Sequence, residues 1–357
     1  MDLIQHWNIG WGLTSSCNSK CKHCYNNSGE KEAKEVSFEE AKQIVDKLSG
    51  NNVKTINYGT GECGLVDFFW ELVKYVHQKN IVQGITTNGY SVNSHTIENI
   101  KHFINDVDVS LDYPDKEKNN ELRGTNNAWN WAINACDLLK KHAINFSIVT
   151  CLHSLNSTPK HIDKFLKICK QYQCEWRINW FKPTGRGKIN ELLKLKPIIV
   201  HDIFRYIVEK TIIIALPNPY FSAIIGLNAR QWAPCGMESF RITPSTEVVP
   251  CVYFTREIQN LSLLNKSFAE VVDSKKMREV KKRNPLFCQY CEWYHSCRGG
   301  CLSRAYLEYN TINAPDAFCF KKTTLKENPL KNLKYNFCGL SKKVHDNYLC
   351  TLIVRPI

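Results

Sequence analysis

The chain has 357 residues, of which 43% are hydrophobic and 23% are charged, a composition that is typical of a globular protein and argues against disorder. The apolar segment that comes nearest to the length of a membrane span is residues 211–227. It is interrupted by Pro217, Asn218 and Pro219, so we expect no span. The net charge of +13 fits a solvated basic surface or a docking surface for an acidic partner. The basic clusters lack interleaved aromatic residues, which does not favour nucleic-acid binding.

The N-terminus shows neither the basic segment nor the apolar segment of a signal peptide, so we expect a cytoplasmic protein. No segment long enough for a separate leader-binding domain precedes the first expected strand, and we expect none there. Seventeen cysteines are too many for packing alone in a long chain without an export signal. The cysteine content therefore indicates metal or redox chemistry.

Short apolar segments alternate with amphipathic ones as far as residue 181. The expected strands are residues 8–14, 53–59, 81–88, 106–112, 144–151 and 174–181. The expected helices are residues 37–49, 66–79, 94–103, 127–142 and 159–172. Ser37 and Glu40 fit a capping box, and Pro159 fits the first position of its helix. This alternation predicts an α/β fold, a partial (β/α)6 TIM-like barrel whose chemistry gathers at the C-terminal ends of its strands.

The alternation ends after residue 187. A helix at residues 198–210 and a strand at residues 211–216 lead to a region rich in loops and cysteines. We divide the chain into a core barrel (1–185), a linker that completes the barrel (186–230), a cysteine-rich domain (231–325) and a C-terminal tail (326–357). The sequence predicts no structure for the tail.

Cys17, Cys21 and Cys24 follow the first strand with the spacing Cys-x3-Cys-x2-Cys. Three thiolates can hold three irons of a [4Fe–4S] cubane and leave the fourth iron open, whereas four would make a closed electron carrier. A zinc site is the alternative, although zinc ligands usually come as paired Cys-x2-Cys units. The spacing therefore favours an iron–sulfur cluster with one open iron.

This loop, with His23 before its last cysteine, resembles the signature of the radical S-adenosylmethionine (SAM) superfamily. The resemblance implies that SAM binds the open iron and is cleaved reductively to a 5′-deoxyadenosyl radical, which abstracts a hydrogen atom from the substrate. Segments at later strand ends resemble further family motifs: a Gly-Gly-Glu-like turn at residues 59–62 and a Ser-Leu-Asp segment at residues 110–112, followed by Arg-Gly. The SAM-binding residues implied by the resemblance are His23, Thr60, Gly61, Glu62, Asn88, Ser110, Asp112 and Arg123.

A second cysteine pattern resembles the SPASM extension of radical SAM peptide-modifying enzymes, with zinc knuckles as the alternative. The resemblance implies an outer auxiliary cluster held by Cys288, Cys291, Cys297 and Cys319. It implies an inner auxiliary cluster held by Cys235, Cys251 and Cys301. A cysteine that some relatives carry shortly after the first of these is absent, so the inner cluster has no identified fourth ligand. No ligand spacing is seen for Cys63, Cys136, Cys151, Cys169, Cys174, Cys338 and Cys350.

Relatives with this extension mostly act on peptides. The leading hypothesis is therefore a maturase of a ribosomally synthesised peptide that performs epimerisation or cross-linking, with a flavodoxin- or ferredoxin-type electron donor. Val252 follows Cys251 where sulfatase-maturing relatives carry an aspartate base, which argues against formylglycine formation. The alternatives are a radical SAM enzyme of small-molecule or tetrapyrrole biosynthesis and a non-catalytic iron–sulfur electron carrier.

An epimerase must return a hydrogen atom to its substrate, and a cysteine outside the ligand groups is the natural donor. We favour Cys338 for this role because residues 336–339 read as a turn, with Cys63 and Cys151 as the other possibilities.

Overall fold

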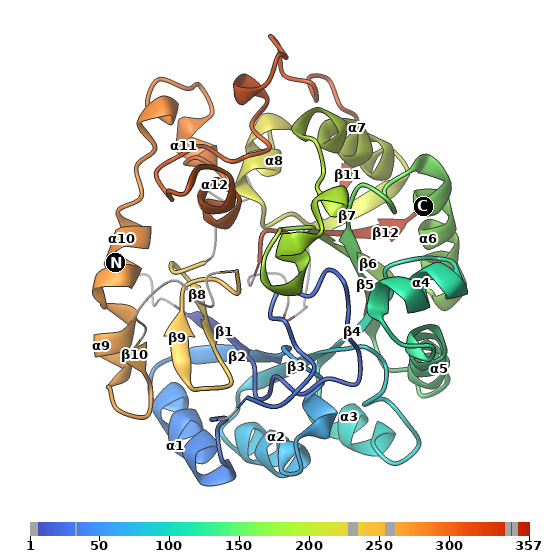
Figure 1. The fold of residues 1–357 in the computed structure, drawn as a ribbon, viewed down its shortest axis with the longest axis vertical. Coiled ribbons are helices and arrows are strands. Elements are labelled where there is room, and N and C mark those ends of the chain that lie inside the picture. The colour runs from blue at the N-terminus through green and yellow to red at the C-terminus, as the bar shows by residue number, and fades with distance from the viewer. Residues whose placement is uncertain (1–5, 33, 228–234, 254–260, 340–343, 345–348) are drawn as a thin grey trace.

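The computed structural model describes residues 6–32, 34–227, 235–253, 261–339, 344 and 349–357. Its framework is a curved sheet of parallel strands with helices on the outside (Figure 1). The six parallel strands predicted from the sequence are β1 (Trp7–Trp11), β2 (Val53–Tyr58), β3 (Val82–Thr87), β4 (Asp106–Ser110), β5 (Phe146–Leu152) and β6 (Glu175–Trp180). Each pairs in parallel with its neighbour in chain order, as right-handed crossovers require.

Two of the connecting helices, those that follow Ser37 and Thr158, begin where their capping residues predict. The first six are α1 (Phe38–Ser49), α2 (Phe69–Gln78), α3 (Ile97–Phe103), α4 (Lys116–Arg123), α5 (Ala128–Lys141) and α6 (Pro159–Tyr172). The capping box of Ser37 and Glu40 is formed, and Thr158 caps α6 ahead of Pro159. Helix α4 was not expected, because its residues are nearly all polar and show no apolar period. It begins after Asp115, whose side chain accepts a hydrogen bond from a backbone N–H of its first turn.

Later segments extend the sheet on both sides of this framework. The additional strands are β7 (Thr211–Ala215), β8 (Ser239–Ile242), β9 (Glu247–Val249), β10 (Leu261–Ser262), β11 (Asn336–Phe337) and β12 (Leu352–Pro356). Strand β8 pairs in parallel with β1, and β12 lies antiparallel between β6 and β7. The tail, for which no structure was predicted, therefore contributes a central strand to the same sheet as the barrel.

The remaining helices are mostly short. They are α7 (Pro197–Val208), α8 (Pro219–Ile224), α9 (Phe268–Val272), α10 (Lys275–Lys281), α11 (Tyr294–Cys297) and α12 (Leu302–Tyr309). One apolar core runs between the sheet and its helices, and it includes the fully buried Trp11, Trp176 and Trp180. In the region around α10 to α12 a separate small core consists of two cysteines with Val280 and Leu302. Such a small core suits a region stabilised by metal ligation.

No helix in the described ranges is long and apolar enough to cross a membrane.

Candidate functional site

The C-terminal ends of β2 to β6 line a cavity that is open to solvent. The thiols of Cys17, Cys21 and Cys24 lie on its wall. All the residues that the resemblance assigns to SAM also line it: His23, Thr60, Gly61, Glu62, Asn88, Ser110, Asp112 and Arg123. The fold thus brings segments that are distant in sequence to the end of the barrel where α/β-barrel enzymes have their active sites.

The three cysteines stand on a loop of residues 15–29, the cluster loop, which Figure 1 shows in dark blue near the centre of the molecule. Backbone hydrogen bonds hold its shape: Cys17 N donates to Gly29 O at 3.0 Å, and Cys24 N donates to Cys21 O at 3.2 Å. These hydrogen bonds fold the loop back on itself.

Burial raises the pKa of the Cys17 thiol to about 11 and that of Cys21 to about 12. Both thiols are therefore protonated at neutral pH, and a metal would displace those protons on binding. Among the residues that the structure describes, no three His, Cys, Asp or Glu side chains converge as the ligands of a single ion do. In a cubane each cysteine ligates a different iron, so its sulfurs surround a larger body. The three-thiol set fits a cluster better than a mononuclear metal.

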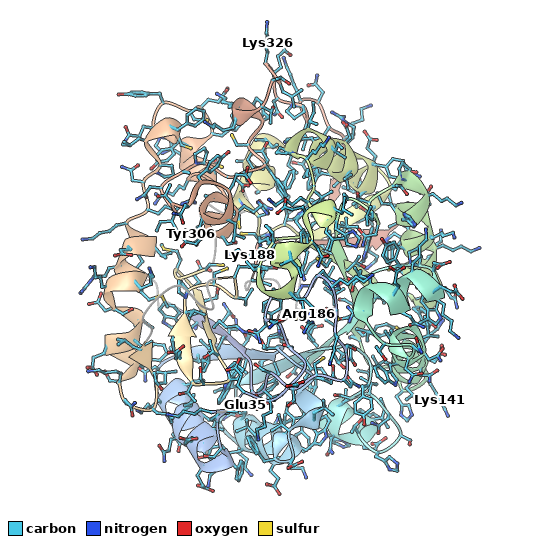
Figure 2. The ribbon with its side chains drawn as sticks, viewed as in Figure 1. Glu35, Lys141, Arg186, Lys188, Tyr306 and Lys326 are labelled. Carbon is cyan, nitrogen blue, oxygen red and sulfur yellow. The ribbon has the colours of Figure 1, made fainter. Side chains whose placement is uncertain are left out.

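A segment after β6 is hydrogen-bonded to the backbone of the cluster loop. It is the short 3-10 helix η2 (Gly185–Ile189), and Figure 2 labels its Arg186 near the centre of the view. Arg186 donates from Nη1 to Cys21 O at 3.0 Å and from Nη2 to a second carbonyl of the loop at 2.7 Å. Gly185 has a φ of +54°, and a Cβ there would lie 2.6 Å from Cys24 O. From the sequence, this segment marked only the end of the strand–helix alternation.

Glu62 is 1% exposed, and several hydrogen-bond donors surround its carboxylate. Its carboxylate accepts hydrogen bonds from the Thr87 and Ser91 hydroxyls, and from Asn88 N at 2.8 Å. Burial raises the pKa of Glu62, because the charged form has lost its water. A ligand ammonium in the cavity would supply the missing counter-charge. The preceding Gly61 has a φ of +63°, and a Cβ there would lie 2.4 Å from a cluster-loop carbonyl oxygen.

Asp112 connects the cluster loop to α4. Its Oδ2 lies 2.6 Å from Arg123 Nη2 and 3.2 Å from His23 Nε2, and its Oδ1 accepts from Cys151 N at 2.8 Å. Burial alone would raise the pKa of Asp112, but Arg123 and then His23 hold it well below its usual value. The site therefore contains a fixed negative charge between two basic groups.

The cavity is also lined by two basic residues, Arg177 and Lys182, that sequence reasoning missed. Arg177 forms a buried ion pair with Asp108, and Lys182 lies over the Tyr253 ring with its Nζ 3.9 Å from the ring centroid. The signal for Arg177 was visible, since a charged residue between Trp176 and Ile178 interrupts an apolar strand. Lys182 follows that strand and carries no comparable signal.

The cysteines assigned to the inner cluster also come together. Cys235, Cys251 and Cys301, which we call the inner cysteine group, are each 2–3% exposed. The thiols of Cys235 and Cys251 are hydrogen-bonded to each other. Lys182, on the cavity wall, interacts electrostatically with Cys301 and Cys251. The inner group therefore adjoins the cavity that holds the cluster loop.

The other four cysteines share a separate cavity of about 370 Å³. This outer cysteine group consists of Cys288, Cys291, Cys297 and Cys319, and all four line the cavity. Asp316 lies between the two groups: it lines this cavity, and its Oδ2 accepts from Cys301 N at 2.8 Å. The grouping that the resemblance implied is thus found in space, and its role in binding a cluster stays a prediction.

Cys338 is exposed, its N–H donates to Ile213 O beside β7, and it does not line the cavity. Cys63 is buried outside the lining, whereas Cys151 belongs to it. Burial, and next the charge of Asp112, raise the pKa of Cys151, so its thiol keeps the hydrogen that a donor must supply. The placement favours Cys151 over Cys338 as hydrogen donor.

Residues 11–168 match the family model of the radical SAM superfamily. The chain is similar to mycofactocin maturase MftC of Mycobacterium tuberculosis, with 26% identity over 329 residues that cover 87% of this chain and 82% of the relative. It is also similar to the AdoMet-dependent heme synthase of Nitratidesulfovibrio vulgaris, with 24% identity over 347 residues that cover 88% of this chain and 92% of the relative.

Its fold is similar to that of Streptococcus suis SuiB bound to precursor peptide SuiA, with a TM-score of 0.72, 14% identity, and coverage of 88% of this chain and 75% of that one. The family implies a [4Fe–4S] cluster and SAM as cofactors. The chain therefore carries a radical SAM domain at residues 11–168 and is an enzyme similar over 87% of its length to mycofactocin maturase.

Proposed function

We propose that this enzyme matures a ribosomally synthesised peptide by epimerisation or cross-linking. The observation that carries the proposal is the extent of its similarity to mycofactocin maturase, which covers 87% of the chain and so exceeds the radical SAM domain. The cysteine-rich part belongs to the shared length, and in the family it accompanies peptide substrates. The peptide-bound state of SuiB, whose fold is similar, supports the same substrate class.

In this proposal Cys17, Cys21 and Cys24 hold the cluster that binds SAM. When bound, the two cofactors supply the 5′-deoxyadenosyl radical that removes a hydrogen atom from a substrate C–H bond. Glu62 accepts the SAM ammonium, because its buried carboxylate lines the cavity and forms no ion pair with any residue that the structure describes. The Asp112–Arg123 pair holds the charged side of the cavity in place, and the barrel excludes water from the radical.

The inner and outer cysteine groups each hold an auxiliary cluster, so we propose three clusters in all. The division of the chain is the one expected from the sequence, with a core barrel at 1–185, a linker at 186–230, an auxiliary-cluster domain at 231–325 and a tail at 326–357. The basic net charge suits docking of an acidic flavodoxin or ferredoxin. The reducing cytoplasm is the compartment that keeps these thiols available for iron.

Reconstituted, reduced enzyme should be incubated with SAM and the peptides encoded by short open reading frames beside its gene. A product of unchanged connectivity that gains one deuterium from D₂O indicates epimerisation, whereas loss of two hydrogens indicates a cross-link. Under epimerisation, Cys151→Ala should abolish deuterium incorporation, while Cys338→Ala should not.

The second candidate is tetrapyrrole biosynthesis, which the similarity to AdoMet-dependent heme synthase favours. An iron-bound porphyrin with carboxylate side chains is the matching probe. Turnover of that porphyrin, with no turnover of any neighbouring peptide, would overturn the peptide proposal.

A further inference from the structure

Cys350 precedes β12, in the tail for which the sequence predicted no structure. Strand β12 runs antiparallel to β6, with Leu352 opposite Ile178. The start of β12 therefore lies at the C-terminal end of β6, close to where Lys182 follows. Because the tail inserts as an antiparallel strand, Cys350 lies at the end of the barrel where the parallel strands have their C-termini.

The thiol of Cys350 is 4% exposed and packs against Cys301. These two thiols are hydrogen-bonded, as are Cys235 and Cys251 in the same region. Cys235 in turn interacts electrostatically with both Cys301 and Cys350. Four segments of the chain therefore deliver four buried thiols to one place.

Lys182 gives an independent indication of negative charge at this place. Its side chain is 6% exposed, and within the described ranges it forms no ion pair with any carboxylate. It lies over the Tyr253 ring and interacts with the thiols of Cys301 and Cys251. A buried ammonium without a counter-charge is costly, and a cluster held by thiolates would supply that charge.

We propose that Cys350 is the fourth ligand of the inner cysteine group, which therefore holds its cluster with four thiolates and has Lys182 as its counter-charge. This inference rests on the proposed iron–sulfur assignment and is independent of the peptide substrate. Four thiolates leave no open iron. The inner cluster then carries electrons, and the substrate is held by the cavity wall rather than by a bond to iron.

The test starts from the full chain with Cys17, Cys21 and Cys24 changed to Ala, so that only auxiliary clusters remain. Adding Cys350→Ala should lower iron from about eight to about four atoms per chain, or convert one cubane to a [3Fe–4S] cluster visible by EPR. The matched control is Cys169→Ala, which removes a buried free thiol that is hydrogen-bonded to Cys174. Iron content and EPR spectra equal to those of the parent would overturn the proposal.

A second variant keeps the proposal testable if Cys350→Ala folds poorly. In otherwise unaltered enzyme, Lys182→Met should lower the reduction potential of one auxiliary cluster, because a positive charge beside it is lost. An EPR-monitored redox titration measures that shift, and an unchanged potential overturns the counter-charge role. Zinc without iron in the parent overturns both the inference and the cluster assignment, whereas inactivity on peptides changes neither readout.

Discussion

The buried ion pair between Asp112 and Arg123 allows a quantitative test of how the SAM cavity is built. The side chains are 1% and 7% exposed, and their closest oxygen and nitrogen lie 2.6 Å apart. Asp112→Asn preserves the shape of the side chain and its ability to accept from Cys151 N, but it removes the charge. Arg123 then stays buried with no carboxylate beside it.

Breaking a buried ion pair by removing one partner costs about 3–5 kcal/mol of unfolding free energy. The chain offers a matched control in Glu121, on the same helix α4, which pairs with Lys22 of the cluster loop at 2.7 Å. These two side chains are 72% and 49% exposed, so Glu121→Gln should cost about 1 kcal/mol or less. Both variants neutralise a carboxylate that is paired with a basic side chain, one in a buried pair and the other in an exposed pair.

Urea unfolding of the metal-free protein at pH 7 measures both free energies. The pKa of Asp112 is held well below its usual value in the native state, so Asp112 stays charged there at low pH. Its contribution to the free energy of unfolding is therefore complete above about pH 4 and is lost as the pH falls further. The difference between the variants should therefore persist from pH 7 to about pH 5. Equal losses for Asp112→Asn and Glu121→Gln would refute the reasoning.

Three further predictions address the cofactors and the pH dependence. Changing Cys17, Cys21 and Cys24 to Ala should abolish 5′-deoxyadenosine formation, measured by chromatography, and retained cleavage would show that the wrong cysteines are assigned. Glu62→Gln should weaken SAM binding by about 1.5–3 kcal/mol in equilibrium titrations, through loss of a charge-assisted hydrogen bond, and unchanged affinity would remove Glu62 from the site. Burial, and next His23, lower the pKa of His153 to about 3. Because the unfolded value is about 6.5, native stability should fall as pH drops below that value, by up to about 1.4 kcal/mol per pH unit, and His153→Gln should flatten this slope in urea titrations.

The barrel was predictable because its six parallel strands and most of its helices carry a local signal. The capping box at Ser37 and the helix start at Pro159 are confirmed. Two elements carried no such signal. Helix α4 is almost wholly polar and is positioned by its Asp115 cap, and β12 is a short apolar strand whose partners lie nearly the length of a domain away in sequence.

The residues of the candidate site also divide into those with a local sequence signal and those without one. The residues assigned to SAM were identified through motifs at strand ends, and the structure gathers all of them on one cavity. Arg186 and Lys182 were missed because their importance lies in long-range contacts: carbonyl oxygens of the cluster loop for Arg186 and distant thiols for Lys182. Cys350 was not assigned as a ligand because it has no ligand spacing to the other cysteines. A cysteine that reaches the group on a strand from the tail does not need such spacing.

The central proposal is that each of the three groups of cysteines holds one iron–sulfur cluster. Iron analysis and Mössbauer spectroscopy of anaerobically reconstituted protein test this claim most directly. We predict about twelve iron atoms per chain, all in [4Fe–4S] clusters, with one cluster whose spectrum changes when SAM is added. Stoichiometric zinc with no cubane signal would contradict the account.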